Sequence, residues 1–516
     1  MDTTKLAPPA NRFQPTPKTV TVLVSDPVQQ PARRTALLLA LVCVGVGLRL
    51  TALLSDRCLW IDEAMLALNL VDRTPAQLLG KLDYNQGAPV GFLLAAKAGI
   101  SAFGPGAWAM RLVPFLASVA GLVGFAFVAR RLLPAGASLL AVGLFAVSPH
   151  LVTYAAECKQ YASDAAIAVG LFAAALGLLE GKGGWRWAGL AAAGAAAVWF
   201  SHPSVFVLGG IGTGLLVSAL VERDRPRFFA AGGTVATWLV SFAACYFLCL
   251  KQLGGNKYLT DYWAGHFMSL PPKGLGDLAW LVDHWIAFFT TPGGFGGALV
   301  PLGGFAAVLS LVGLREFART RWAVAVALVT PAVLVLLASG LQKYPIGGRL
   351  MLFMTPLAVL LVARGAWAVF DGLSERNAFA ARALLALLVL SPVWASFEFL
   401  KQPPRSEQLA PVLERVRSEF RPGDRVFVYY GAVPAFTFYT RERPFPAEAV
   451  TLGAEHRDDP AAYRGELAGL RGRVWYVVSH RHGTEEAEAL AVLDARARPA
   501  REVKQTGAAA YLYELE

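Results

Sequence analysis

The chain has 516 residues, of which 55% are hydrophobic and only 16% are charged, and its mean hydropathy is +0.48. These values exclude an ordinary soluble globular protein and indicate a polytopic membrane protein. The formal net charge of +11 comes largely from short Lys and Arg clusters between apolar runs, a pattern typical of cytoplasmic membrane loops and not of a nucleic-acid-binding surface.

The N-terminal residues 1–35 are rich in Pro, Thr and Gln and end in Arg33-Arg34, directly before the first apolar run. This composition predicts a disordered tail, and the basic pair predicts that the tail lies in the cytoplasm. The segment lacks a short signal-peptide core followed by a cleavage site. We therefore expect the first apolar run to remain as a membrane anchor.

Apolar runs separated by basic residues predict about eleven transmembrane helices, on the length needed to cross a bilayer core. The expected spans are 36–54, 111–129, 135–149, 164–179, 187–201, 204–221, 228–250, 297–314, 322–340, 350–370 and 383–399.

A twelfth apolar run, 88–103, is short and contains Lys97. If it crossed the membrane, Arg130-Arg131 and the arginines of the two later loops, 223–227 and 315–321, would face outward. If it does not cross, all of them face the cytoplasm, as the positive-inside rule favours. We therefore interpret 55–110 as one external loop whose helices lie on the membrane surface.

The C-terminal region 401–516 is charged, and its short apolar runs are separated by turn residues, which predicts a small external α/β domain. It lacks a Gly-x-Gly-x-x-Gly nucleotide fingerprint, so a structural or acceptor-contacting role is favoured over a second active site. The expected elements are helices at 407–420, 433–439 and 485–496 and strands at 425–430, 474–479 and 509–515.

Two external loops carry unusual ionisable residues. Asp62 and Glu63 directly follow the first span, where adjacent carboxylates have no packing purpose and indicate acid-base chemistry. In the loop 148–164, Glu157, Tyr161 and Asp164 have the spacing of one helix face, although they could simply be paired polar groups that close a helix end. Ionisable groups at membrane depth are costly, which favours a function for this face.

Two later external loops carry aromatic and basic residues. The loop 251–296 contains Tyr262 and His266 before an amphipathic segment, and its aromatic residues could line a lipid or sugar groove or form an interfacial belt. In the other loop, Lys343 and Arg349 flank Gly347-Gly348. A guanidinium there suits a phosphate, although an interfacial arginine could also snorkel.

The seven His residues and five Cys residues show no metal-ligand spacing. His202, in Ser201-His202-Pro203, is expected at the external end of a span, where it could face the same cavity. Cys58 and Cys158 are both expected outside, and a disulfide between them is left open because sequence does not give their separation.

Taken in chain order, these motifs resemble the GT-C glycosyltransferases that use polyprenyl-phosphate sugars, in the branch of protein O-mannosyltransferases and lipid A aminoarabinose transferases. Gly87-Ala88 and Gln160 depart from the family pattern, replacing a His-Pro pair and a Pro. The resembling segments are Trp60–Ala64 (the Asp-Glu motif), Tyr84–Leu94 (the membrane-surface helix), Arg111–Pro114 (the start of the second span), Glu157–Asp164 (the Arg-Pro-Tyr or Lys-Pro-Tyr stretch) and Gly348–Pro356 (the lipid-phosphate-binding stretch).

This resemblance implies a GT-C-like catalytic membrane domain over 36–400 that transfers a sugar from a polyprenyl-phosphate donor to an external acceptor hydroxyl, with inversion. Asp62 would be the base and Glu63 a supporting residue that orients a neighbour or a metal. Arg349, Lys343 and Lys159 would bind the donor phosphate. Residues expected to line the substrate cavity are Tyr84, Glu157, Tyr161, Asp164, His202, Tyr262 and His266.

The expected surroundings are a bacterial inner membrane and its lipids, with the N-terminus in the cytoplasm and no nucleic-acid partner. The acceptor could be a lipid, a glycan or a protein, and a divalent metal ion is left open. Two alternatives remain, a secondary transporter and a non-catalytic scaffold that binds lipid-linked glycans. A transporter should show mid-membrane charges and two similar halves, and neither is evident in the sequence.

Overall fold

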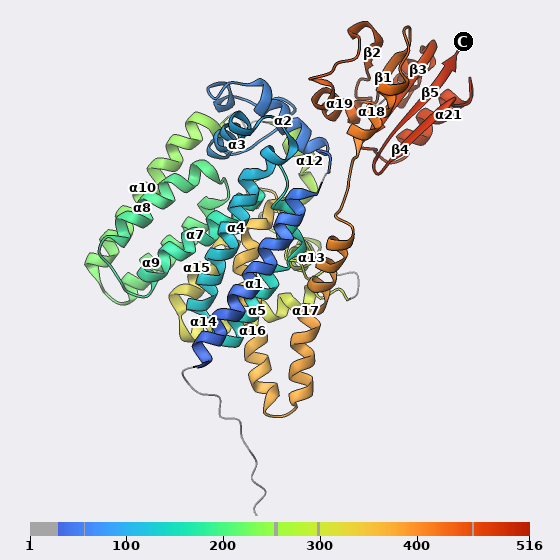
Figure 1. Ribbon diagram of the computed structural model, residues 1–516. Coiled ribbons are helices and arrows are strands. Elements are labelled where there is room, and N and C mark those ends of the chain that lie inside the picture. Colours follow the sequence, from blue (N-terminus) through green and yellow to red (C-terminus); the bar gives the residue numbers. More distant parts are fainter. Residues whose placement is uncertain (1–28, 56, 252–255, 297–299, 457–458) are drawn as a thin grey trace, which may run out of the picture.

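A bundle of apolar helices makes up most of the chain, and a small α/β domain follows at one end of it (Figure 1). The computed structural model describes residues 29–55, 57–251, 256–296, 300–456 and 459–516. Most of the expected N-terminal tail, 1–35, lies outside these residues, and 29–35 already belong to the first helix.

Each of the eleven expected spans overlaps a helix, although residues 297–299 of the span 297–314 lie outside the described residues. Only eight helices in the described residues are long and apolar enough to cross a bilayer, so the number eleven stays a prediction. Of the other three, α5 and α8 have 12 and 15 residues, and α14 carries Arg315, Glu316 and Arg319. The bundle helices are α1 (Gln29–Leu54), α4 (Ala107–Leu132), α5 (Ala135–Ala146), α7 (Tyr161–Leu179), α8 (Arg186–Phe200), α9 (Ser204–Val221), α10 (Arg225–Cys245), α14 (Gly303–Thr320), α15 (Trp322–Gly340), α16 (Thr355–Ser374) and α17 (Ala378–Lys401).

Shorter elements extend or connect these helices. The chain is a multi-pass membrane protein, because its long apolar helices pack into one bundle. The shorter elements are α6 (Pro149–Tyr154), the π-helix η2 (Tyr246–Leu250), α12 (Lys257–Tyr262), η3 (Ala264–His266), α13 (Leu275–Thr290) and the 3-10 helix η4 (Gly348–Met354).

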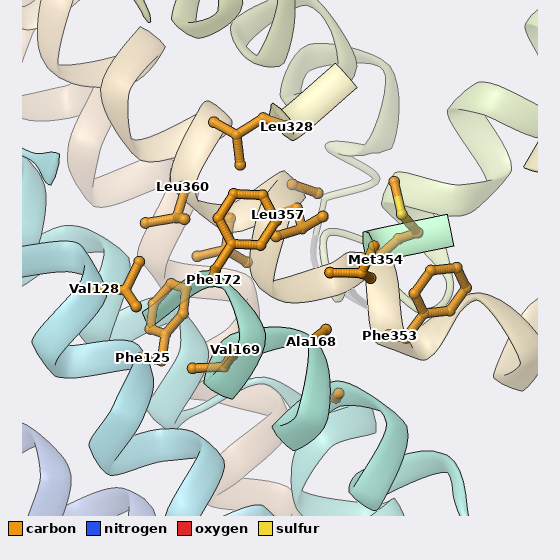
Figure 2. Packing of buried hydrophobic residues seen from close by; sticks show 14 of the residues in the cluster. Phe125, Val128, Ala168, Val169, Phe172, Leu328, Phe353, Met354, Leu357 and Leu360 are labelled. Atoms are coloured by element: carbon orange, nitrogen blue, oxygen red, sulfur yellow. The ribbon is translucent and has the colours of Figure 1, made fainter. Parts of the chain in front are cut away.

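Figure 2 shows a part of the bundle core in which apolar side chains of α4, α7, α15, η4 and α16 pack together. Phe125, Phe172 and Leu357 come from three of these helices and are almost fully buried. Close helix contacts rely on glycine: a Cβ atom on Gly365 would lie 2.0 Å from the backbone oxygen of Leu309 in α14. Small residues at such crossings let membrane helices approach closely.

Residues 57–106 form a cap on the bundle, containing α2 (Ile61–Asp72), the 3-10 helix η1 (Gln77–Leu79) and α3 (Val90–Phe103) (Figure 1). Lys97 on α3 donates hydrogen bonds to the carbonyl oxygens of Leu70 and Val71, at 2.7 and 3.2 Å. The lysine therefore satisfies carbonyls at the C-terminal end of α2, a favourable place for a positive charge.

The basic clusters gather at the opposite end of the bundle from the cap. Arg131 and Arg321 both form ion pairs with Glu180, at 2.5 and 3.2 Å. Arg34, near the start of α1, donates to Ser138 at 2.9 Å, and Arg227 donates to the carbonyl of Leu178. These contacts bring basic residues from separate loops to one side, as the charge pattern predicts.

The C-terminal domain contains a five-stranded mixed sheet of order β2-β1-β3-β5-β4. All six expected elements are present, and β2, α20 and β4 are additional elements that were not expected. β4 is an edge strand with mostly exposed side chains, so it lacks the apolar alternation that marks a strand. The elements are α18 (Leu409–Glu419), β1 (Arg425–Val428), η5 (Tyr430–Ala432), α19 (Val433–Thr440), η6 (Ala447–Ala449), β2 (Val450–Leu452), α20 (Pro460–Ala468), β3 (Gly472–Ser479), α21 (Glu485–Asp494), β4 (Arg501–Gln505) and β5 (Ala508–Leu515).

The C-terminal domain docks on the cap through apolar side chains. Leu66 and Phe92 of the cap belong to the same buried cluster as Leu413, Phe436 and Trp475 of the domain. Helix α19 packs directly against α2. The first helix of the cap is therefore held between the bundle and the C-terminal domain.

Candidate active site

Asp62 and Arg349 lie far apart in the chain but meet as an ion pair. Asp62 is in the first turn of α2, and Arg349 is at the start of η4. The Arg349 guanidinium carbon also lies 5.2 Å from the centroid of the Trp60 ring and 5.7 Å from that of Tyr161. Both charged side chains keep about a fifth of their surface exposed, at 19% for Asp62 and 20% for Arg349. An acid and a cation thus share one partly open position.

Lys159 adds a second positive charge to this position. It lies in the turn before α7, is buried, and donates a hydrogen bond to Gln86 of the cap at 2.5 Å. Burial alone would raise the pKa of Asp62, but the charges of Lys159 and Arg349 outweigh it and hold that pKa below its ordinary value. Asp62 is therefore a carboxylate at neutral pH.

Glu63, the neighbour of Asp62, has a different environment. Arg111 of α4 grips its two oxygens with hydrogen bonds of 2.9 and 2.7 Å, and the Cys158 backbone N–H donates to it at 2.7 Å. Glu63 and Arg111 are each 1% exposed. Burial raises the pKa of Glu63. Arg111, Arg57 and the Cys158 N–H together outweigh burial and hold that pKa below its ordinary value, so this group is also ionised. Glu63 joins α2, α4 and the turn before α7.

Glu157 lies in the turn between α6 and α7, because α7 begins only at Tyr161. The expectation that Glu157, Tyr161 and Asp164 share one helix face is wrong for Glu157. The turn still brings Glu157 into the field of Arg349 and Lys159. Burial, together with the negative charge of Glu63, raises the pKa of Glu157 to about 7.

The raised pKa of Glu157 predicts a pH-dependent stability. Between pH 4.5 and about 7 the folded chain keeps a proton that the unfolded chain releases. The stabilisation of the folded chain by protonated Glu157 is therefore full below pH 4.5 and is lost as the pH rises through about 7. We expect the thermal unfolding midpoint of the wild type in detergent to fall as the pH rises over this window. The midpoint of Glu157→Gln, which has no titrating group at this position, should fall less. Parallel pH profiles for the two proteins would contradict the assignment.

Tyr161 and Asp164 lie in the first turn of α7. The Tyr161 ring contacts Arg349, whereas Asp164 is buried beside Ser201. His202 follows Ser201 and lines a cavity between the cap and the bundle, together with Gln86 and Asn256. Burial lowers the pKa of His202 to about 4, so its imidazole is neutral.

The remaining expected site residues have other surroundings. Tyr84 and Tyr262 are exposed, at 40% and 61%. His266 accepts the backbone N–H of Ile346 on its carbonyl oxygen, at 2.8 Å, and so supports the loop that leads to Arg349. Lys343 lies on an exposed turn, and within the described residues its ammonium group makes no ion pair.

At the sequence level, no family model and no curated protein matches the chain. Among solved structures, it is similar to the lipid A aminoarabinose transferase ArnT from Cupriavidus metallidurans bound to undecaprenyl phosphate, with a TM-score of 0.55 and 13% identity over 94% of this chain and 98% of ArnT. The oligosaccharyltransferase AglB from Archaeoglobus fulgidus, in complex with an inhibitory peptide and a dolichol-phosphate, gives a TM-score of 0.52 and 11% identity over 93% of this chain and 74% of AglB. The chain has the GT-C fold.

Within this GT-C fold, several residues around Asp62 were not found by sequence reasoning. Trp60 and Gln86 were quoted only as parts of motifs, yet they contact Arg349 and Lys159. Glu407 and His480 approach α2 from the C-terminal domain. The sequence carries no signal for these two residues, because it does not show that the C-terminal domain docks on the cap.

Two further expectations about the candidate site concern a disulfide and metal ligands. Cys58 and Cys158 do not form a disulfide. Cys58 interacts with Tyr439, and Cys158 is fully buried with its backbone N–H bonded to Glu63. In the described parts of the chain, no group of three or more His, Cys, Asp or Glu side chains is arranged to hold a metal ion.

Proposed function

We propose that this protein is a membrane glycosyltransferase that moves a sugar from a polyprenyl-phosphate donor to an acceptor hydroxyl. The observation that carries the proposal is the contact between Asp62 and Arg349. A donor phosphate held by this guanidinium has its sugar directly beside a carboxylate that can act as a base. ArnT with undecaprenyl phosphate and AglB with dolichol-phosphate support a lipid-phosphate ligand for this fold.

Arg349 is the proposed main contact to the donor phosphate. Its planar guanidinium can donate paired hydrogen bonds to phosphate oxygens, and the Trp60 and Tyr161 rings help hold it in place. Lys159 supplies a second charge from the turn before α7. Lys343 is a proposed outer contact, since its turn leads into the same loop. The phosphate competes with Asp62 for the guanidinium and so releases the carboxylate.

The proposed transfer is a direct displacement. The acceptor hydroxyl oxygen forms a bond to the anomeric carbon, while the bond from that carbon to the phosphate oxygen breaks. Asp62 takes the hydroxyl proton, and the polyprenyl phosphate leaves with the electron pair. Arg349 and Lys159 stabilise the charge that develops on the leaving group. A single displacement inverts the anomeric configuration.

The proposed setting is the outer face of a bacterial inner membrane. The basic residues at the end of the bundle away from the cap favour the cytoplasmic side for that end. The cap and the C-terminal domain then lie outside. Tyr84, Tyr262, His266, Asp164 and His202 are proposed to border the route of a sugar, or of an acceptor that is a lipid, a glycan or a protein.

The function is tested by incubating the purified protein with a panel of polyprenyl-phosphate sugars and measuring free polyprenyl phosphate, with and without candidate acceptors. We expect release for at least one sugar, stimulated by its acceptor. Asp62→Asn protein serves as the inactive control. Absence of release with every donor, from folded protein that still binds polyprenyl phosphate, would favour a non-catalytic binding protein.

Replacing Arg349 with Lys is expected to weaken donor use while keeping the positive charge. Lysine lacks the planar fork and stacks less well on Trp60 and Tyr161. Losing one charged hydrogen bond predicts a fall in kcat/KM of roughly tenfold or more. Arg364→Lys is the matched control, because Arg364 pairs with Glu316 farther along the same apolar span. Equal kcat/KM values for both variants would contradict phosphate binding by Arg349.

A further inference from the structure

The start of α2, which carries Asp62, is capped by another domain. The first N–H groups of a helix have no partners within the helix and need external acceptors. Trp60, at the N-cap position, provides no side-chain hydrogen bond. The Ile61 N–H donates instead to Oε2 of Glu407, at 3.1 Å. Glu407 lies in the segment that links the bundle to the C-terminal domain.

The second oxygen of Glu407 is also engaged. His480 at the end of β3 binds Oε1 through Nδ1, at 2.8 Å. Glu407 is only 6% exposed, and the next residue, Gln408, donates its N–H to the carbonyl of Thr506 at 2.8 Å. His480 has a φ of 50°, which is uncommon for a residue with a side chain and requires support from its surroundings. Both ends of the Glu407–His480 pair are therefore fixed by the C-terminal domain.

A second contact holds the residues before α2. The Leu59 N–H donates to the Tyr439 hydroxyl of α19, at 2.6 Å. Trp60, between these two anchored residues, contacts Arg349 on one side and lies 6.5 Å from the His480 ring on the other. The C-terminal domain thus holds the backbone segment that carries both Trp60 and Asp62.

We propose that Glu407 is a positioning residue for the transfer reaction: held by His480, it caps α2 and sets the place of the Asp62 carboxylate relative to Arg349. This inference rests on the proposed function. In this proposal the C-terminal domain contributes to the geometry of the active site through Glu407 and His480. Misplacing a reacting group by a small distance is costly to the rate, so the loss should appear in kcat more than in the KM for the donor.

The first experiment measures backbone protection and does not depend on any transfer activity. Hydrogen exchange of full-length Glu407→Ala protein is compared with wild type in detergent. We expect exchange about tenfold faster at Ile61 and Asp62, as for loss of a helix cap, with α15 unchanged. Glu414→Gln, at an exposed position of α18, is the control. Unchanged exchange at Ile61 in Glu407→Ala overturns the proposal even if transfer fails for other reasons.

The second experiment uses two substitutions of His480. Asparagine can place an amide donor near the position of Nδ1, whereas glutamine places its donor near Nε2. We expect His480→Asn to keep most of the wild-type kcat, and His480→Gln and Glu407→Ala to lose about tenfold with little change in donor KM. Equal kcat for the Asn and Gln variants, or losses that follow a lowered melting temperature alone, would overturn the positioning role. A wild-type protein without activity on any donor refutes the proposed function instead.

Discussion

Asp62→Asn is expected to lower the rate of sugar transfer by roughly a hundredfold to ten-thousandfold, the usual contribution of a positioned general base. The amide is nearly the same size as the carboxylate but does not accept the acceptor proton at neutral pH. The measurement is release of polyprenyl phosphate in the presence of an acceptor, with kcat determined at saturating donor. The change leaves the buried contacts of Glu63 intact, so the melting temperature should change little.

Binding separates this role from a simple loss of structure. Asp62 competes with the donor phosphate for Arg349, so undecaprenyl phosphate should bind Asp62→Asn at least as tightly as wild type. Asp72→Asn is the matched control, because Asp72 ends the same helix and forms an exposed ion pair with Arg441. Full transfer activity in Asp62→Asn would falsify the assignment of Asp62 as the base.

The candidate site could be predicted in part because the charge pattern predicts that the segments carrying its residues lie on the same side of the membrane. Asp62, Lys159 and Arg349 were each chosen from a different loop, and the structure brings them together. Their approach depends on how α2 and η4 pack at the end of the bundle. Apolar periodicity locates helices but does not give the distance between two loops, so the sequence does not show that Arg349 meets Asp62 while Lys343 stays on an exposed turn.

Other features depend on packing that has no local sequence signal. Glu157 was expected on a helix because its spacing to Tyr161 is helical, but the chain turns before α7 and leaves Glu157 in a buried turn. The cap that Glu407 provides for α2 joins residues from two domains. Ile61 and Glu407 are each ordinary residues within their own segments, and no periodic pattern in the sequence indicates that they meet.

The two adjacent carboxylates acquire different roles because of helix geometry. Successive residues on a helix point about 100° apart, so Asp62 faces the partly open side toward Arg349 while Glu63 faces the buried side toward Arg111. The sequence predicts two adjacent carboxylates at the start of a helix. Because their side chains point in different directions, Glu63 is expected to support Asp62 and not to share its role. The buried ion pair of Glu63 then fixes the orientation of the helix that presents Asp62.

Breaking this buried ion pair is expected to have the largest effect on stability. Glu63→Gln leaves the Arg111 guanidinium uncompensated in a site where both side chains are 1% exposed. Removing one partner of such a pair costs about 3–5 kcal/mol. The quantity to measure is the free energy or midpoint of unfolding in detergent. Asp72→Asn, which removes the partner of the exposed Arg441, should cost less than about 1 kcal/mol.

A double substitution tests whether Glu63 acts only through Arg111. Replacing both residues by Met removes the unpaired charge together with its partner, so the loss should be clearly smaller than the sum of the two single losses. Glu63→Gln protein kept below its melting temperature should lose less kcat than Asp62→Asn, because the Asp62 carboxylate is still present and only its orientation is less well fixed. If Glu63→Gln instead keeps its stability but loses transfer as completely as Asp62→Asn, Glu63 takes part in the chemistry, and the division of roles between the two carboxylates is wrong.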